Sequence, residues 1–253
     1  MQLIDSHAHI YLPEFDADRA EVLQRAAEKG IATILMPAID ATTHQQMLAV
    51  EAAWPQCRAM MGLHPCSVKE EYKQELAVVE ESLKSRKFAA LGEIGLDFYW
   101  DTTYEQQQFE AFETQIRWAL HYDLPVVIHS RNAMDACIDV VSRFPGVRGV
   151  FHCFSGTVEQ ARRLLDLHFY LGIGGVVTYK NAGLDVVIKA IGLDAVLLET
   201  DAPYLSPVPF RGKRNESSYL SLIAAKLAEA TGLSIEAVAT ITTQNAKKLF
   251  GLR

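Results

Sequence analysis

Two histidines separated by one residue, His7 and His9, follow a short apolar stretch near the start of the chain. Side chains two positions apart on an extended segment point to the same side. Two imidazoles placed in this way can bind one divalent metal ion together. Alone the pair is a weak signal, because structural histidines at a strand end have the same spacing. Its meaning depends on whether further ligand residues occur at comparable places in the chain.

Four further residues of metal-binding types end or directly follow other apolar runs. They are Glu93, His129, His152 and Asp201. Neutral imidazoles bind borderline divalent ions, and one carboxylate can bridge two ions. Two ions ~3.5–4 Å apart can stabilise the attacking and leaving oxygens of a hydrolytic reaction, and can lower the pKa of a bound water towards ~7. The residue types therefore predict a dinuclear hydrolytic centre.

We expect Glu93 to bridge the two ions and to be a catalytic residue. The other expected ligands form two groups: His7, His9 and Asp201 for one ion, and His129 and His152 for the other. Asp201 is also the expected general base, because one of its oxygens can stay free to take a proton from the metal-activated water. This donor set suits Zn²⁺, Mn²⁺ or Fe²⁺, and Mg²⁺ can be recruited with the substrate.

Eight short apolar runs recur along the chain, and each is followed by a stretch with helical periodicity. The runs are Leu3–Asp5, Thr33–Met36, Arg58–Met61, Ala89–Gly92, Val126–Ile128, Gly149–Phe151, Tyr170–Ile173 and Val196–Leu198. Strands separated by helices imply parallel pairing with right-handed crossovers. Eight such units favour an α/β fold in which a closed (β/α)8 TIM barrel carries the metal site at the C-terminal ends of its strands.

The intervening segments have the spacing of amphipathic helices, for example residues 16–29 and 105–121. Gly30 and Gly232 are expected just after helix ends, and Thr157 at a helix start. Residues after Leu233 are expected to form one or two short helices that cap the barrel. Because no linker-like segment divides the sequence, we predict a single domain over residues 1–253.

The composition sets limits on the class of protein. Hydrophobic residues make up 49% and charged residues 22%, as in ordinary globular domains. The net charge of −7 argues against an extended DNA-coating surface. The four cysteines form no C-x-x-C pair, which favours reduced thiols. Without a signal-peptide pattern or an apolar run of about 18 residues, we predict a cytoplasmic protein with no membrane association. No feature indicates an obligate protein partner.

Several residues are candidates for substrate binding at the same end of the predicted barrel. They are His64, Arg131, Arg211, Lys213 and Arg214. Guanidinium groups suit pairs of phosphate oxygens. The alternatives are a structural role for His64, an ion pair between Arg131 and Asp135, and a merely solvated basic loop at 211–214. The aromatic run 98–100 either stacks on a base or packs within its loop.

Several segments resemble those of the TatD-type metal-dependent deoxyribonucleases. The principal ones are Leu3–His9, Pro125–Asp135 and Leu197–Pro203, and residues 62–65, 92–97, 152–156 and 212–216 also match. The resemblance covers nearly the whole chain, and the motifs occur in the same order. It implies a (β/α)8 hydrolase with two divalent ions, often with 3′–5′ exonuclease activity on DNA ends. The six expected ligands coincide with the metal positions of the family.

The sequence departs from the family pattern at two positions. Tyr11 stands where the first motif usually has Asp or Asn, and Ser217 follows Glu216 where Pro is usual. Neither departure removes an expected ligand. We therefore expect both to alter the mouth of the pocket and the substrate preference rather than metal binding.

Three functions fit the pattern, and the leading one is hydrolysis of phosphodiester bonds in DNA. The second is an amidohydrolase-type hydrolase of esters, lactones or amides. Many such enzymes bridge their metals with a modified lysine, whereas here no lysine falls at a predicted strand end and Glu93 takes that place. The third is a non-catalytic barrel that binds a metal or a phosphate ligand. The presence of every expected ligand and of a candidate base argues against it.

Overall fold

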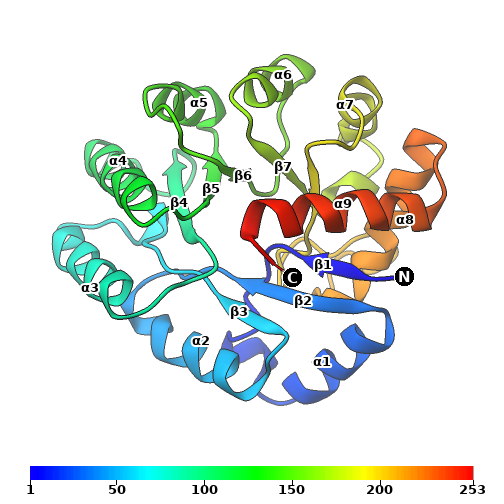
Figure 1. The fold of residues 1–253 in the computed structure, drawn as a ribbon, viewed down its shortest axis with the longest axis horizontal. Coiled ribbons are helices and arrows are strands. Elements are labelled where there is room, and N and C mark those ends of the chain that lie inside the picture. The colour runs from blue at the N-terminus through cyan, green and yellow to red at the C-terminus, as the bar shows by residue number, and fades with distance from the viewer. Residues whose placement is uncertain (253) are drawn as a thin grey trace.

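The computed structural model describes residues 1–252, in which short parallel strands alternate with helices around a ring (Figure 1). The strands are β1 Leu3–Asp5, β2 Ile31–Met36, β3 Cys57–Ala59, β4 Leu91–Asp97, β5 Val126–Arg131, β6 Gly149–Phe151, β7 Tyr170–Ile173 and β8 Val196–Leu198. The α-helices are α1 Arg19–Glu28, α2 Ala41–Ala53, α3 Tyr72–Ser85, α4 Glu105–His121, α5 Met134–Ser142, α6 Val158–Asp166, α7 Leu184–Ile191, α8 Leu220–Thr231 and α9 Ile235–Phe250. Short 3-10 helices span Pro13–Phe15, Pro65–Ser67, Gly175–Thr178 and Ser217–Tyr219.

Backbone hydrogen bonds close the strands into a ring. Strands β1 to β3 pair in parallel in sequence order, and so do β4 to β8. Between β3 and β4, the Met61 amide donates to Ala90 O (3.2 Å) and the Gly92 amide to Met61 O (2.9 Å). Between β1 and β8, the Ser6 amide donates to Leu198 O (3.0 Å). The predicted (β/α)8 barrel is confirmed.

The inside of the barrel is filled by apolar side chains from seven of the strands or the residues next to them. They are Ile4, Leu35, Met60, Ala90, Val127, Val150 and Leu197. Ala246, Leu249 and Phe250 of α9 pack against this cluster, and Figure 1 shows α9 lying across the near face of the ring. Alternate strand residues such as Leu3 and Ile34 join the larger core beneath the surrounding helices. Helix α9 therefore covers the N-terminal end of the barrel and leaves the opposite end for polar groups.

Strands β4 and β5 run further towards that polar end than the apolar runs predicted. They pair with each other beyond the predicted limits, with Gly95 opposite His129 and Asp97 opposite Arg131. The polar residues interrupt the apolar pattern, but their backbone groups continue the ladder. As a result Glu93 and His129, expected where the fourth and fifth strands end, lie within β4 and β5.

The ends of the helices follow the expected chemistry. At the start of α6, Thr157 Oγ1 accepts from the Gln160 amide (3.2 Å) and Gln160 Oε1 accepts from the Thr157 amide (2.9 Å). Gly232 ends α8 with a φ of 73°. The last segment is one helix of 16 residues rather than short ones, because its buried face continues to Phe250. Within residues 1–252, no helix is both long and apolar enough to cross a membrane.

The contact of α9 with the barrel interior predicts an asymmetric response to substitution. Leu249 is 4% exposed, whereas Leu233 just before α9 is 43% exposed. Leu249→Ala is expected to lower the free energy of unfolding by about 2–5 kcal/mol, because it opens a cavity under the barrel. The matched control Leu233→Ala should change it by less than about 0.5 kcal/mol. Urea unfolding followed by circular dichroism measures both, and equal losses would contradict the role given to α9.

Candidate metal centre

The carboxylate of Glu93 is the centre of the polar end of the barrel. Its Oε2 lies 3.1 Å from His7 Nε2 and 3.6 Å from His9 Nε2. Its Oε1 lies 2.9 Å from His129 Nδ1 and 2.8 Å from His152 Nε2. Glu93 is only 2% exposed. One carboxylate from β4 therefore faces histidines that follow β1 and β6 or lie in β5, as a bridging ligand would.

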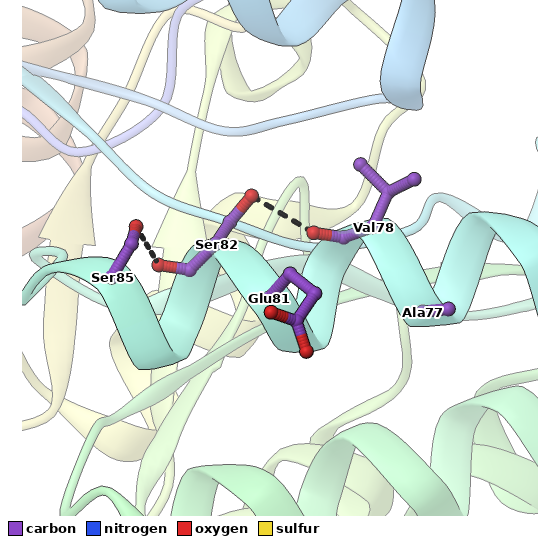
Figure 2. A pocket seen from close by; sticks show the side chains of 5 residues that line it. All are labelled: Ala77, Val78, Glu81, Ser82 and Ser85. Atoms are coloured by element: carbon purple, nitrogen blue, oxygen red, sulfur yellow. Dashed lines mark hydrogen bonds between the residues drawn. The ribbon is translucent and has the colours of Figure 1, made fainter.

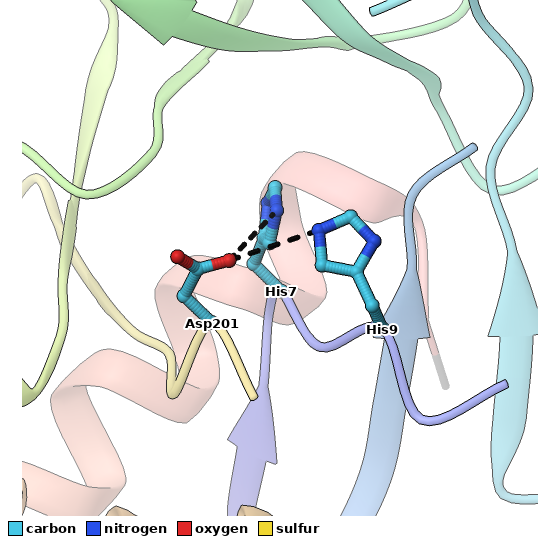
Figure 3. A group of neighbouring side chains, drawn as sticks. All are labelled: His7, His9 and Asp201. Atoms are coloured by element: carbon cyan, nitrogen blue, oxygen red, sulfur yellow. Dashed lines mark ion pairs between the residues drawn. The ribbon is translucent and has the colours of Figure 1, made fainter. Parts of the chain in front are cut away.

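Asp201 completes the side of the site formed by the β1 histidines. Its Oδ1 lies 3.6 Å from His7 Nε2 and 3.7 Å from His9 Nε2, and Figure 3 shows both rings turned toward this one oxygen. The Asp201 amide donates to His7 O (2.8 Å), which fixes this residue beside β1, and its φ is 56°. Ligand atoms of His7, His9 and Asp201 lie within 4.8 Å of one another.

The predicted second group, His129 and His152, does not appear as one of the compact groups of possible ligands. Besides the group with Asp201, ligand atoms within 4.8 Å of one another combine Glu93 with His7 and His152, and Glu93 with His64 and His129. The rings of His7 and His152 stack with centroids 3.9 Å apart. His129 and His152, predicted to share an ion, approach the same oxygen of Glu93 from two sides.

The electrostatics of the site favour a bound cation. Burial raises the pKa of Glu93, but the imidazoles of His152, His64 and His7 outweigh it and hold that pKa well below its usual value. Burial lowers the pKa of His7 well below its usual value, which keeps the ring neutral. Burial also raises the pKa of Asp201 to about 6. Burial lowers the pKa of His152 and of His129, but the carboxylates of Glu93 and Glu199 outweigh it at His152, and those of Asp97 and Glu93 at His129, so that both pKa values are raised. Without a metal, protons on these rings therefore balance the charge of Glu93, and a divalent ion would take the place of those protons.

Unpaired buried nitrogens support the same conclusion. Both ring nitrogens of His7 are buried and make no hydrogen bond within residues 1–252. Buried polar atoms in proteins are normally paired. Since His7 Nε2 faces the oxygens of Glu93 and Asp201, a divalent ion between them would satisfy it. The residues present therefore fit a metal centre.

His64 lies in the same site but is oriented as a hydrogen-bond donor. Its Nδ1 accepts from the Cys66 amide (3.0 Å), so the neutral ring carries its proton on Nε2. That Nε2 lies 3.4 Å from Glu93 Oε1. A protonated nitrogen cannot ligate a metal. This geometry places His64 beside the reaction centre as a donor to Glu93 or to a ligand.

Two carboxylates that the sequence analysis did not single out lie behind the histidines. Asp97 Oδ2 is 2.9 Å from His129 Nε2, and Glu199 Oε1 is 3.4 Å from His152 Nδ1. The Glu199 side chain packs against the backbone of Gly172, where a Cβ would collide with Glu199 Oε2. Carboxylates behind metal-binding histidines orient the ring and raise its basicity. Their positions within a few residues of Glu93 and Asp201 are the signal that could have identified them.

Two glutamines on the inner face of α4 hold two of the strand ends in place. Gln108 accepts from the Asp97 amide (2.8 Å) and donates to Asp97 O (3.1 Å). Gln115 accepts from the Leu63 amide (2.7 Å) and donates to Leu63 O (3.2 Å), next to His64. Both glutamines are buried. Helix α4 thus positions the backbone beside two site residues through amide side chains rather than through apolar packing alone.

The two departures from the family pattern do not lie at the pocket mouth, so that expectation was wrong. Tyr11 is 1% exposed and lies behind His9, with its hydroxyl 3.0 Å from His9 Nδ1. Ser217 is 0% exposed and lies beside Asp5, whose pKa is raised to about 7 by burial. Both side chains belong to the packed layer that supports the site.

Arg131 and two residues of the aromatic run, Tyr99 and Trp100, form one group of contacting side chains. The Arg131 guanidinium lies over the rings of Tyr99 (4.0 Å) and Trp100 (5.1 Å). The ion pair predicted between Arg131 and Asp135 is not formed. Asp135 Oδ1 instead pairs with Arg163 at 2.7 Å. Phe98 packs against Phe109 (6.0 Å between ring centroids) and the core, as the packing alternative predicted. Tyr99 and Trp100 contact each other (4.9 Å) and remain 53% and 66% exposed, so their outer faces are open to a ligand. Their backbone amides donate to Asp97 Oδ1, which ties the exposed group to the site.

The basic residues after β8 divide into two kinds. Arg214 donates to both carboxylate oxygens of Asp18 (2.8 and 2.7 Å) and is therefore held in a structural ion pair rather than offered to a substrate. Arg211 lies over the ring of Tyr179 (4.3 Å) and Lys213 near the ring of Phe210 (5.9 Å). Of the predicted basic contacts in this loop, Arg211 and Lys213 keep their role as candidates.

A hollow of about 470 Å³ lies on the outer side of α3, away from the strand ends (Figure 2). It is lined by Ala77, Val78, Glu81, Ser82 and Ser85. The two serine hydroxyls donate to carbonyls of the helix itself, Ser82 to Val78 O (2.9 Å) and Ser85 to Ser82 O (2.8 Å). These serine hydroxyls are thus engaged within the helix, and no lining residue belongs to the groups of possible metal ligands among the described residues.

Comparison with known proteins agrees with this geometry. The model of the family described as TatD related DNase matches residues 4–251. The chain belongs to this family. This TatD-family chain is 38% identical over 251 residues to the uncharacterized metal-dependent hydrolase YabD of Bacillus subtilis, which covers 98% of each chain. It is 32% identical over 261 residues to the 3′–5′ ssDNA/RNA exonuclease TatD of Pantoea ananatis, covering 99% of this chain and 100% of that protein.

Among solved structures, the TatD-family chain is similar to YjjV, a TatD homologue from Escherichia coli K12. The TM-score is 0.94 at 33% sequence identity, covering 99% of this chain and 98% of that chain. The likeness supports the barrel described above. The chain is thus a TatD-family metal-dependent hydrolase, as the order of its motifs indicated.

If Glu93 is the shared ligand, removing its charge will empty the site. Substitution of a residue that only orients a metal ligand lowers metal affinity by roughly 10- to 100-fold. Because Glu93 would be a ligand itself, we expect Glu93→Gln to lower metal affinity by more than that. Metal content after dialysis, measured by inductively coupled plasma mass spectrometry, checks this. Glu159→Gln, at an exposed position of α6, is the control and should retain the metal of the unmodified protein. Full metal content in Glu93→Gln would contradict the assignment.

Proposed function

We propose that this TatD-family hydrolase is a 3′–5′ exonuclease that cleaves phosphodiester bonds at the ends of single-stranded DNA with two divalent ions. The observation that carries the proposal is the carboxylate of Glu93, each oxygen of which faces a different pair of histidines. The similarity to a relative named as a 3′–5′ ssDNA/RNA exonuclease supports the choice of bond.

In this proposal His7, His9 and Asp201 hold one ion and His129 and His152 the other, with Glu93 between them. Zn²⁺, Mn²⁺ and Mg²⁺ are the candidate ions, which when bound activate water and stabilise negative charge on the phosphate. Asp201 presents Oδ1 to the β1 histidines, and its second oxygen is available to accept a proton from the attacking water.

The surroundings of the site supply groups that suit a nucleotide substrate. His64 has an Nε2–H donor 3.4 Å from Glu93 Oε1, where a phosphate oxygen could accept from it. Arg131 combines a positive charge with the exposed rings of Tyr99 and Trp100. Base stacking on aromatic rings is a sequence-tolerant way to bind single strands. A small ester or lactone would use no such platform, which favours a nucleic-acid substrate.

The decisive experiment is cleavage of end-labelled single-stranded DNA with Mg²⁺ or Mn²⁺. We expect release of mononucleotides from the 3′ end, and a fall in kcat of about 10²- to 10⁴-fold in Asp201→Asn, the usual contribution of a general base. Asp166→Asn, at an exposed position of α6, should behave as the unmodified protein.

Two outcomes would contradict the proposal. Faster turnover of nitrophenyl esters or lactones than of any phosphodiester would identify an amidohydrolase-type activity. A fully metallated protein with no hydrolytic activity, unaffected by Asp201→Asn, would indicate a barrel that only binds its ligand.

The aromatic platform leads to a separate prediction for substrate affinity. Trp100→Ala should raise the KM for a single-stranded oligonucleotide by about 5- to 150-fold, because stacking on one ring contributes about 1–3 kcal/mol. The kcat should change little, since Trp100 does not contact the metal-binding residues. Steady-state kinetics separates the two constants. Tyr122→Ala, which removes an aromatic ring just before β5 at the other end of the barrel, is the control; equal effects of the two variants would rule out stacking on Trp100.

A further inference from the structure

Tyr11 joins His9 to the backbone through two consecutive hydrogen bonds. The Tyr11 hydroxyl donates to Pro37 O at 2.7 Å, and its oxygen lies 3.0 Å from His9 Nδ1. A hydroxyl has a single hydrogen, and a carbonyl oxygen can only accept. Since that hydrogen is used on Pro37, the hydroxyl oxygen must be the acceptor toward His9. The proton between the two side chains therefore belongs to His9 Nδ1.

This arrangement decides which nitrogen of His9 is able to bind a metal. A neutral imidazole has one N–H, so a proton on Nδ1 leaves the lone pair on Nε2. Nε2 is the atom that faces the site, 3.6 Å from Glu93 Oε2 and 3.7 Å from Asp201 Oδ1. Without an acceptor behind it, the ring would be free to place its proton on Nε2 and lose its ligand form.

The support behind His9 differs in charge from that behind the opposite histidines. His129 and His152 have the carboxylates of Asp97 and Glu199 at their far nitrogens. A phenol is neutral at physiological pH, so Tyr11 supplies an acceptor without adding a negative charge. Tyr11 is also 1% exposed and fixed at Pro37, so it cannot turn away from His9.

We propose that Tyr11 is a positioning residue that selects the Nδ1–H form of His9 and so sets the affinity of the ion held by His7, His9 and Asp201. The inference rests on the metal centre of the proposed function but not on its substrate. It concerns a position where this chain departs from the Asp or Asn of the family pattern, and it gives that departure a role in metal binding. Its tests therefore use Zn²⁺ alone, without DNA.

The first test reads the proton directly in the unmodified, metal-free chain. Nitrogen-15 labelling of histidine distinguishes the two neutral forms by NMR. We expect His9 to be in the Nδ1–H form, and in Tyr11→Phe to be a mixture of both forms, since phenylalanine keeps the ring but removes the acceptor. A dominant Nε2–H form in the unmodified chain would overturn the proposal.

The second test measures binding of Zn²⁺ by competition with a chromophoric chelator. In Tyr11→Phe we expect one of two bound ions to weaken by about 10-fold or more, the usual cost of losing a partner behind a ligand, with the other ion little changed. Tyr204→Phe is the control, because Tyr204 is 48% exposed and its ring centroid is 6.2 Å from that of His9, whereas the hydroxyl that contacts His9 Nδ1 is that of Tyr11. Thermal unfolding of both variants establishes that they are folded.

Equal Zn²⁺ affinities for Tyr11→Phe and the unmodified protein would overturn the proposal, and so would equal losses in Tyr11→Phe and Tyr204→Phe. The outcome is separable from the proposed function. A chain that cleaves no DNA but loses one ion in Tyr11→Phe would support the role of Tyr11 while contradicting the nuclease.

Discussion

The buried charge of Glu93 is the constraint on which the rest of the structure depends. An ionised carboxylate inside a protein is unstable unless opposite charge or hydrogen bonds compensate it. Here imidazoles provide that compensation, and they outweigh the effect of burial on the pKa of Glu93. They come from distant parts of the sequence and reach one carboxylate only when the strands form a ring. Closure of the barrel and assembly of the site are therefore the same event.

A layer of buried polar contacts keeps these side chains in place whether or not an ion is bound. The carboxylate of Asp5 accepts from the amide (2.9 Å) and the hydroxyl (2.6 Å) of Thr200. These bonds join β1, which precedes His7, to the segment after β8 that carries Asp201. Gln108 and Gln115 hold the other strand ends from α4. Because the supports are buried and mutually bonded, the ligand geometry is built into the scaffold, the condition for a precise site.

Much of this arrangement could be predicted from local patterns, because a barrel of this kind repeats one unit. Apolar runs separated by helical stretches located the strands, and the residues at the ends of those runs were the candidate ligands. The extension of β4 and β5 could not be read in this way, since their ladder continues through polar residues such as Asp97. The inward-facing glutamines of α4 were equally hidden, because a polar side chain on a helix normally indicates a solvated face.

The environment of Tyr11 also could not be predicted from the local sequence. Its position beside the histidine pair suggested a place at the pocket mouth, whereas the chain after β1 turns inward and buries it against Pro37. Its partner Pro37 follows helix α1 and strand β2, so no local sequence pattern indicates this contact. The sequence pattern was enough to predict the residues that would bind the metal ions. It was not enough to predict the long-range partners that orient those residues.

The way the ring is closed also bears on how the chain is made. Its first strand bonds to residues near position 200, as in the contact of Ser6 with Leu198, and its N-terminal end is filled by α9, the last helix. A ribosome delivers β1 long before either partner exists. The apolar interior therefore stays open through most of synthesis, and contacts of this sequence separation form slowly. Until α9 has been synthesised, the apolar residues at this end of the barrel lack their cover, and exposed apolar surface of this kind makes a partly folded chain prone to aggregation.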